Sequence, residues 1–271
     1  MPQNPPSSKA ANTHSAVRPV LIVPAAGQGA RFGTSVAKQW HMVAGRSLLE
    51  WSLRAITDVL SCIKVVIALH EADFRTRAPM LRSIFPEHLL LVCTGGASRA
   101  ASVMNCLRSL RESEGTDVDD MQWVMVHDAV RPLAPQADVL KLVAAVDRMP
   151  EDLWHGALLA EPVAASIKKS SGWLRAEEPV IASEVDRTDL WLAQTPQLFR
   201  LGALWNSLQQ QSDHLIQDES QAVRSCGGAV RLVAGSSLNF KVTWPQDLDW
   251  VSTLLTHRRN ATPAVSPLLP T

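Results

Sequence analysis

The sequence predicts an α/β protein with a mostly parallel sheet and helices on both faces of that sheet. Short apolar segments alternate along the chain with segments of helical composition, which is the order that builds β–α–β units. The apolar segments are continuous rather than interrupted by polar residues, as expected for strands buried on both faces. A length of 271 residues allows one large domain or two small ones.

The expected elements follow one another along the chain. Strands are expected at residues 20–23, 65–69, 89–93, 123–126, 157–160 and 230–233. Helices are expected at 47–59, 98–112, 136–149 and 218–226, and Pro245 can begin a last helix because its missing N–H is no loss in a first turn. We therefore expect a single domain over 18–257. The ends at 1–17 and 258–271, rich in Pro and other residues typical of loops, are expected to be disordered tails.

One segment, residues 161–187, departs from this alternation. It contains Pro162, a turn region at 168–172 and an extended return through Val180 and Ile181. The pattern predicts a β-hairpin that projects from the domain. Two uses stay open for it, a simple surface excursion or an arm that embraces a second subunit.

Charge and cysteine content exclude several classes of protein. Basic and acidic residues number 26 each, which argues against a sequence-blind grip on nucleic acid or on an anionic membrane. No apolar run approaches the roughly 18 residues of a membrane-spanning helix, and the start of the chain has no apolar core of the kind found in secretory signals. The sequence has four cysteines, Cys62, Cys93, Cys106 and Cys226, and none of them forms a CxxC pair. We therefore expect reduced thiols and a cytoplasmic protein.

The most informative segment is VLIVPAAGQGARFG at residues 20–33. Its predicted strand is followed by the small residues Ala25, Ala26, Gly27 and Gly29. Such a loop lets the backbone approach a ligand and presents N–H groups to phosphate. Phe32 stands where a dinucleotide-binding fingerprint has its third glycine, and the sequence has no GxxxxGK[ST] motif. Because Arg31 and Lys38 flank the loop, we predict a triphosphate site; the alternative is a structural turn with two solvated cations.

A second polar segment, VHDAVRP at residues 126–132, follows another predicted strand, where open α/β sheets bind their ligands. Asp128 can hold a divalent metal ion, because Mg²⁺ often takes only one or two protein carboxylates together with phosphate oxygens. The alternative is that Asp128 caps the next helix and pairs with Arg131. We interpret His127 as a structural histidine rather than a ligand or a base.

Together with motifs further along the chain, these segments resemble the 2-C-methyl-D-erythritol 4-phosphate cytidylyltransferase family. The matching motifs, in order, are PAAGxGxR, KQ, GGxxR, VHDAxRP, VDR, TPQ and NxKVT, within residues 20–45, 94–103, 126–132, 184–199 and 238–248. The resemblance implies a Rossmann-like nucleotidyltransferase fold with a β-hairpin arm. It also implies cytidylyl transfer from CTP to 2-C-methyl-D-erythritol 4-phosphate, with release of pyrophosphate, in the non-mevalonate isoprenoid pathway. Mg²⁺ or another divalent cation would be the cofactor, and the arms of a homodimer would complete each other's acceptor sites.

The resemblance also implies roles for individual residues. The implied catalytic residues are Arg31, Lys38, Arg187 and Lys241. CTP would bind the small residues of the first loop (Ala25, Ala26, Gly27 and Gly29) and Gly96, Ala97 and Ser102. The acceptor would bind Asp128, Arg131, Ser166, Arg187, Thr195 and Lys241, with Ser166 and Arg187 coming from the partner's arm. Asp128 would also hold the metal ion. Without the resemblance, Ser98 would be a helix cap and Arg99 a residue on a solvated helix face.

Four positions depart from the family pattern: Trp40, Ala97, Val130 and Ala165. Because Ala165-Ser166 replaces the usual Asp-Thr, a hydroxyl remains in the arm but a carboxylate is lost. Two other functions therefore stay open: a cytidylyltransferase for another polyol phosphate, such as ribitol 5-phosphate, and a non-catalytic nucleotide-binding protein on the same scaffold.

Overall fold

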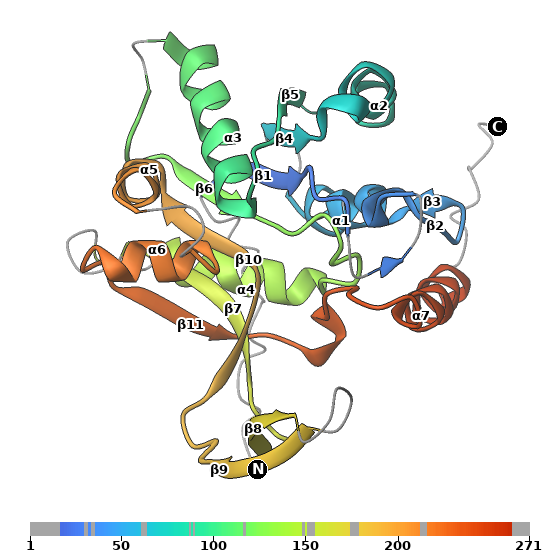
Figure 1. The fold of residues 1–271 in the computed structure, drawn as a ribbon. Coiled ribbons are helices and arrows are strands. Elements are labelled where there is room, and N and C mark those ends of the chain that lie inside the picture. Colours follow the sequence, from blue (N-terminus) through green and yellow to red (C-terminus); the bar gives the residue numbers. More distant parts are fainter. Residues whose placement is uncertain are drawn as a thin grey trace, which may run out of the picture.

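A seven-stranded sheet forms the centre of the protein in a computed structural model (Figure 1). The model describes residues 17–29, 32–33, 36–60, 64–86, 88, 90–115, 118–147, 150, 155–173, 179–211 and 216–261. The strands lie in the order β11-β7-β10-β6-β1-β4-β5. Only β10 runs antiparallel to its neighbours, β6 and β7, while the other pairs are parallel. The predicted α/β class with a mostly parallel sheet is thereby confirmed.

The bounds of the elements are as follows. The central sheet contains β1 (Val20–Ala25), β4 (Val65–Leu69), β5 (Leu90–Thr94), β6 (Trp123–Val126), β7 (Gly156–Pro162), β10 (Trp191–Arg200) and β11 (Val230–Ala234). Two small sheets contain β2 (Met42–Val43) with β3 (Arg46–Ser47), and β8 (Ile167–Trp173) with β9 (Pro179–Val185). The helices are α1 (Leu48–Thr57), α2 (Glu71–Ile84), α3 (Arg99–Glu114), α4 (Gln136–Asp147), α5 (Leu201–Gln209), α6 (Glu219–Ser225) and α7 (Asp247–Ala261), with short 3₁₀ turns η2 (Lys38–Trp40) and η5 (Ser237–Asn239).

Every strand and helix expected from the sequence is present, with ends shifted by a few residues. The sequence did not predict α2, α5 or β10. The last helix begins at Asp247 rather than at Pro245 and continues to Ala261, beyond the expected limit at 257. Of the two expected tails, residues 1–16 and 262–271 lie outside the described residues.

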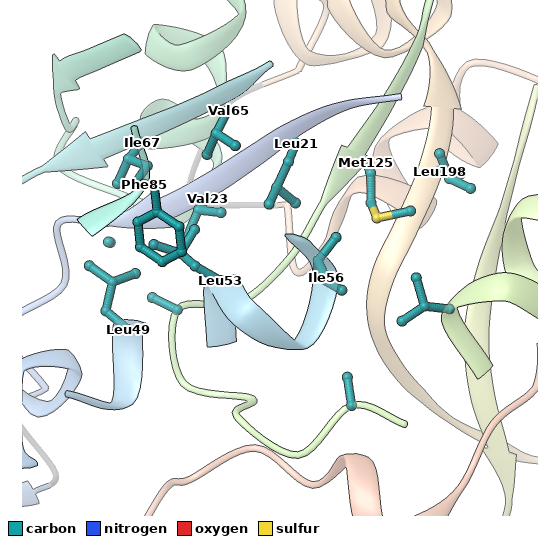
Figure 2. Packing of buried hydrophobic residues seen from close by; sticks show 14 of the residues in the cluster. Leu21, Val23, Leu49, Leu53, Ile56, Val65, Ile67, Phe85, Met125 and Leu198 are labelled. Carbon is teal, nitrogen blue, oxygen red and sulfur yellow. The ribbon is translucent and has the colours of Figure 1, made fainter. Parts of the chain in front are cut away.

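Alternate side chains of each buried strand reach opposite faces of the sheet, because a strand repeats every two residues. Leu21 and Val23 of β1 pack with Leu53 and Ile56 of α1, as Figure 2 shows. The same cluster includes residues of α2 and α4. Val20 and Ile22, with the opposite parity, pack in a second cluster with residues of α3, α5 and α6. Helices on both faces therefore fix the sheet and the positions of the loops at its strand ends.

The predicted β-hairpin is present and projects from the domain (Figure 1). Strands β8 and β9 pair antiparallel, from Ile167 opposite Val185 to Trp173 opposite Pro179. The predicted turn at 168–172 is wrong, because these residues belong to strand β8. The chain between the two strands, 174–178, lies outside the described residues.

None of the helices in the described part of the chain combines the length and the apolar character that crossing a bilayer requires.

Candidate active site

A pocket of about 510 Å³ lies beside the ends of β1, β4, β5 and β6, where parallel sheets place their ligands. Its lining comes from segments that are far apart in the sequence: residues 24–29, 38–39, 70, 96–99, 102, 128–130 and 241. All the implied CTP-binding residues lie in this lining, and so do Lys38, Asp128 and Lys241. Arg31, also predicted for this site, lies outside the described residues.

The first wall is the glycine loop after β1. Gly29 has a φ of +68°, which favours glycine, and a Cβ there would lie 3.1 Å from Cβ of Lys38. Gln39 donates a hydrogen bond from Nε2 to the carbonyl oxygen of Ala25 at 2.8 Å and is buried. The KQ motif is therefore tied to the end of β1, and Lys38 is held beside the loop as the triphosphate hypothesis requires.

The second wall is the turn between β5 and α3. Ser98 caps α3 by accepting the N–H of Ala101 at 2.9 Å, as the sequence predicts. The Ser102 hydroxyl accepts the N–H of Gly96 at 3.1 Å and donates to the carbonyl oxygen of Ser98 at 2.9 Å. Since these bonds occupy the hydroxyl, Ser102 fixes the position of Gly96 as well as lining the pocket.

Three cations surround the carboxylate of Asp128. Nε of Arg99 lies 3.0 Å from Oδ1, while Nζ of Lys241 and Nε of Arg131 lie 3.0 and 3.3 Å from Oδ2. Burial alone would raise the pKa of Asp128, but Arg99, Lys241 and Arg131 hold it well below its usual range. Lys241 is the most accessible of the three, with 40% of its side chain exposed. The structure confirms the alternative interpretation in so far as Asp128 pairs with Arg131. Asp128 does not cap the next helix, because α4 starts only at Gln136.

Arg99 is more important to the site than the pattern suggested. Its Nη1 donates to both carboxylate oxygens of Glu219, at 2.6 and 2.9 Å, and Glu219 is completely buried. Burial lowers the pKa of Arg99, but Glu219 and Asp128 outweigh it and raise the value above the ordinary one. The alternative of a solvated Arg99 is therefore wrong: the side chain links α6 to the pocket.

A buried hydrogen-bond network fixes the backbone of Asp128. The Thr195 hydroxyl accepts the N–H of Asp128 at 3.0 Å and contacts Nδ1 of His127 at 3.2 Å. His127 Nε2 lies 3.2 Å from the carbonyl oxygen of Arg131, so the ring carries its proton on Nε2 and accepts the Thr195 hydroxyl proton at Nδ1. Burial lowers the pKa of His127 to about 4. His127 is thus the structural histidine that the sequence predicts.

Arg131 and Thr195 are placed behind the lining of the pocket. Nη1 of Arg131 donates to the carbonyl oxygen of Asn239 at 2.5 Å, and Nδ2 of Asn239 donates to that of Thr195 at 2.8 Å. These bonds hold the segment that carries Lys241 against Asp128. The acceptor-binding roles of Arg131 and Thr195 stay predictions.

The two arm residues lie away from the pocket of their own chain. Ser166 and Arg187 are exposed, and Arg187 donates a hydrogen bond to the carbonyl oxygen of Ala164 within the arm. Neither residue is part of the pocket lining.

Sequence reasoning missed several other residues of the site: Gln28, Gln39, His70, Arg99 and Glu219. His70 follows β4, and its ring atom Nε2 lies 2.9 Å from the side-chain Nε2 of Gln28. Arg99 and Gln39 belong to motifs that were recognised, GGxxR and KQ, so the motifs themselves were the signal. No local pattern marks Glu219, which meets Arg99 across 120 positions.

Comparison with known proteins gives one consistent family. The family model described as 2-C-methyl-D-erythritol 4-phosphate cytidylyltransferase matches residues 19–257. The chain is 38% identical over 232 residues to the protein of that name from Pseudomonas putida (strain GB-1), covering 85% of this chain and 92% of that protein. It is 37% identical over 247 residues to the one from Paraburkholderia xenovorans (strain LB400), covering 90% and 97%. A crystal structure of a 4-diphosphocytidyl-2C-methyl-D-erythritol synthase superposes with a TM-score of 0.72 at 30% identity, covering 88% of this chain and 99% of that one.

Proposed function

The chain belongs to the 2-C-methyl-D-erythritol 4-phosphate cytidylyltransferase family, and we propose that the pocket described above carries out the reaction of this family. The enzyme has the Rossmann-like nucleotidyltransferase fold and transfers a cytidylyl group from CTP to 2-C-methyl-D-erythritol 4-phosphate in the non-mevalonate isoprenoid pathway. One observation carries the proposal for the site: Lys38 and Lys241, about 200 positions apart, line a single pocket beside Asp128.

The chemistry calls for cations rather than for a general base. The acceptor is a phosphate monoester with a second pKa of about 6, so near neutral pH it is already a nucleophilic dianion. It must approach a triphosphate that carries roughly four negative charges, and in-line attack places further charge on the α-phosphate and on the leaving oxygen. Preorganised positive groups therefore supply the catalysis.

CTP binds between the two walls of the pocket. The triphosphate lies along the glycine loop, where Lys38 is held by the bond from Gln39 to β1. Arg31, from the same loop, contributes the second cation. The cytosine base lies against Gly96 and Ala97, because the Ser102 hydroxyl fixes this turn and a pocket with fixed polar partners can discriminate between bases.

The acceptor phosphate binds at Lys241. In the structure Lys241 pairs with Asp128, and its exposed ammonium can turn toward an incoming phosphate while Arg99 and Arg131 continue to neutralise the carboxylate. Asp128, Arg131 and Thr195 then form the bottom of the acceptor site. Arg131 and Thr195 act there through the buried network that fixes Asp128.

Nucleotidyltransferases generally use divalent metal ions, and the residues present fit one such ion. Asp128 is the only Asp or Glu in the lining formed by the described residues, and Mg²⁺ often binds a single carboxylate together with phosphate oxygens. We propose that Asp128 would hold Mg²⁺, or another divalent cation, once Lys241 has left its Oδ2 atom. A bound metal ion would offset negative charge on the triphosphate oxygens.

We further propose a homodimer in which the arm of one subunit completes the acceptor site of the other. Two features support it: Ser166 and Arg187 lie away from the pocket of their own chain, and the arm exposes the apolar side chains of Ile181 and Val185. Such exposed apolar groups are typical of contact surfaces when they cluster. We place the enzyme in the cytoplasm, which agrees with the free state of Cys93, Cys106 and Cys226.

An acceptor panel tests the proposed function. Purified enzyme is supplied with CTP and Mg²⁺ and with methylerythritol phosphate, ribitol 5-phosphate or no acceptor, and pyrophosphate release is measured. We expect release with methylerythritol phosphate to exceed that with ribitol 5-phosphate by at least tenfold in kcat/KM, about 1.4 kcal/mol. Preference for ribitol 5-phosphate would overturn the acceptor, and no release with any acceptor would favour a non-catalytic nucleotide-binding protein.

A further inference from the structure

Two cysteines face each other just behind the second wall of the pocket. The sulfur atoms of Cys93 and Cys106 lie 3.8 Å apart, although the residues are thirteen positions apart in the chain. Cys93 stands near the end of β5 and is half-buried, whereas Cys106 lies in α3 and is completely buried. Strand β5 and helix α3 pack side by side (Figure 1). A short contact between an accessible and a buried thiol is the arrangement of a sensing cysteine with its resolving partner.

We propose that Cys93 and Cys106 form a peroxide-sensitive site whose reversible disulfide weakens the binding of CTP. The effect on CTP rests on the function proposed above, whereas the thiol chemistry does not. The oxidant is hydrogen peroxide or a small hydroperoxide. The reductant that restores the thiols is a dithiol.

The oxidation proceeds in two balanced steps. The Cys93 thiolate attacks one oxygen of hydrogen peroxide, the O–O bond breaks, and the hydroxide that leaves combines with the proton given up by Cys93 to form water. The Cys106 sulfur then attacks the sulfenic sulfur of Cys93, expels its hydroxyl group and gives up its own proton, which forms a second water. Two thiols and one peroxide thus yield one disulfide and two waters.

The surroundings assign different roles to the two thiols. The hydrogen bond with Cys106 is the largest influence on the pKa of Cys93 and lowers it. Arg108 also lowers this pKa, whereas burial and Glu112 oppose the shift without cancelling it. Burial raises the pKa of Cys106 well above its usual range. Because the thiolate is the reactive form, Cys93 is the residue that attacks peroxide and Cys106 the residue that resolves the sulfenic acid.

The chain between the two cysteines forms part of the CTP pocket. It contains the Gly95-Gly96 turn, Ala97, Arg99 and Ser102. The turn is tightly packed: a Cβ at Gly95 would lie 2.1 Å from Cβ of Ala26 in the glycine loop, and one at Gly96 would lie 2.3 Å from Cβ of Ala101. A disulfide needs a sulfur–sulfur distance of about 2.05 Å, against 3.8 Å in the structure, and we attribute part of this closure to a shift of β5 relative to α3. Such a shift displaces the turn that lines the base site.

The first test measures the bond itself. The full-length enzyme is treated with a small excess of hydrogen peroxide, and its mass and non-reduced peptide map are compared with those of the reduced protein. We expect a loss of about 2 Da and a Cys93–Cys106 cross-linked peptide, both reversed by dithiothreitol. The Cys93→Ser variant should give no cross-link. The control variant Cys226→Ser, at an exposed cysteine, should still form the Cys93–Cys106 cross-link. An oxidised wild type in which Cys93 and Cys106 both remain alkylatable would overturn the proposal.

The second test measures the coupling to CTP by calorimetry, which requires no turnover. We expect the affinity of wild-type enzyme for CTP to fall at least fivefold on oxidation and to recover with dithiothreitol. Peroxide should leave the affinity of Cys93→Ser unchanged. A complete disulfide with unaltered CTP affinity would overturn the coupling. If the proposed function is wrong, the reduced enzyme releases no pyrophosphate in the acceptor panel. The mass measurement of the disulfide does not depend on that result.

Discussion

The carboxylate of Asp128 contacts three cations, two of which, Arg99 and Lys241, line the pocket. This carboxylate remains ionised because three cations outweigh the cost of burying it, and in return it holds Arg99 and Lys241 at 3.0 Å. The sequence predicted Asp128 as a site residue and Arg131 as its neighbour. It did not predict that Arg99 and Glu219 would complete the cluster, since these residues meet only when α3 and α6 come together in the folded chain.

The buried His127 gives the fold a dependence on pH. Its pKa in the folded protein is about 4, against about 6.5 for an exposed histidine, so between these values the unfolded chain takes up a proton that the folded protein refuses. The contribution of His127 to the free energy of unfolding should therefore be fully present above pH 6.5 and fall by up to about 3 kcal/mol as the pH is lowered to 4. His127→Gln keeps one donor and one acceptor but does not titrate, so its stability should change less across this range.

Urea unfolding between pH 4 and pH 7 measures this difference. The control is His257→Gln, because His257 is exposed on α7, and this variant should follow the wild-type profile. A His127→Gln profile as steep as that of the wild type would contradict the assignment of His127 as a neutral buried residue.

Strands that are buried on both faces were the elements predicted best from the sequence. Continuous apolar runs located β1, β4 and β6, because these strands are buried on both faces. Strand β10 was not predicted because its buried stretch contains Gln194, Thr195 and Gln197, whose polar groups bond to neighbouring loops and to the start of α6. Helix α2 was not predicted because Pro79, a residue that disfavours helix, lies inside it and few of its residues are buried. Local pattern cannot reveal polar groups that are satisfied only by tertiary contacts.

The arm supplies a prediction at the same scale. Arg187→Ala should leave the affinity for CTP within about twofold of the wild type and reduce kcat/KM for the acceptor by about 10²-fold, since only the acceptor phosphate would lose a charged partner. Calorimetry with CTP and steady-state kinetics with varied acceptor separate the two effects. Lys169→Ala, on an exposed lysine of the same arm, is the control and should behave as the wild type. Loss of CTP affinity in Arg187→Ala would mean that the arm assignment is wrong.

The fold brings segments from distant parts of the chain to one place. The glycine loop, the turn before α3, the segment after β6 and Lys241 near the end of the chain all line one pocket. Each motif could be recognised in the sequence, and the parallel sheet explains why their loops meet at one edge. The network that ties Asn239 to Arg131 and Thr195 was not predictable, because it depends on the exact packing of three segments.

Sharing of sites between subunits can be tested by mixing two inactive variants. Lys38→Ala damages the pocket and Arg187→Ala damages the arm, so a mixed dimer contains one site in which both residues are intact. If the arm acts in trans, random exchange of subunits should restore up to about a quarter of the wild-type activity. Activity no higher than the sum of the separate variants would favour self-contained subunits.

In the proposed mechanism, cations from distant segments act together on the reacting phosphates, and the turnover of Lys241→Met measures this joint action. Pyrophosphate release is measured at saturating CTP and methylerythritol phosphate, with Lys141→Met, an exposed lysine outside the pocket, as the control. We expect kcat to fall about 10²- to 10³-fold for Lys241→Met and to stay unchanged for Lys141→Met. A Lys241→Met enzyme that turns over within about threefold of the wild-type rate would contradict this mechanism.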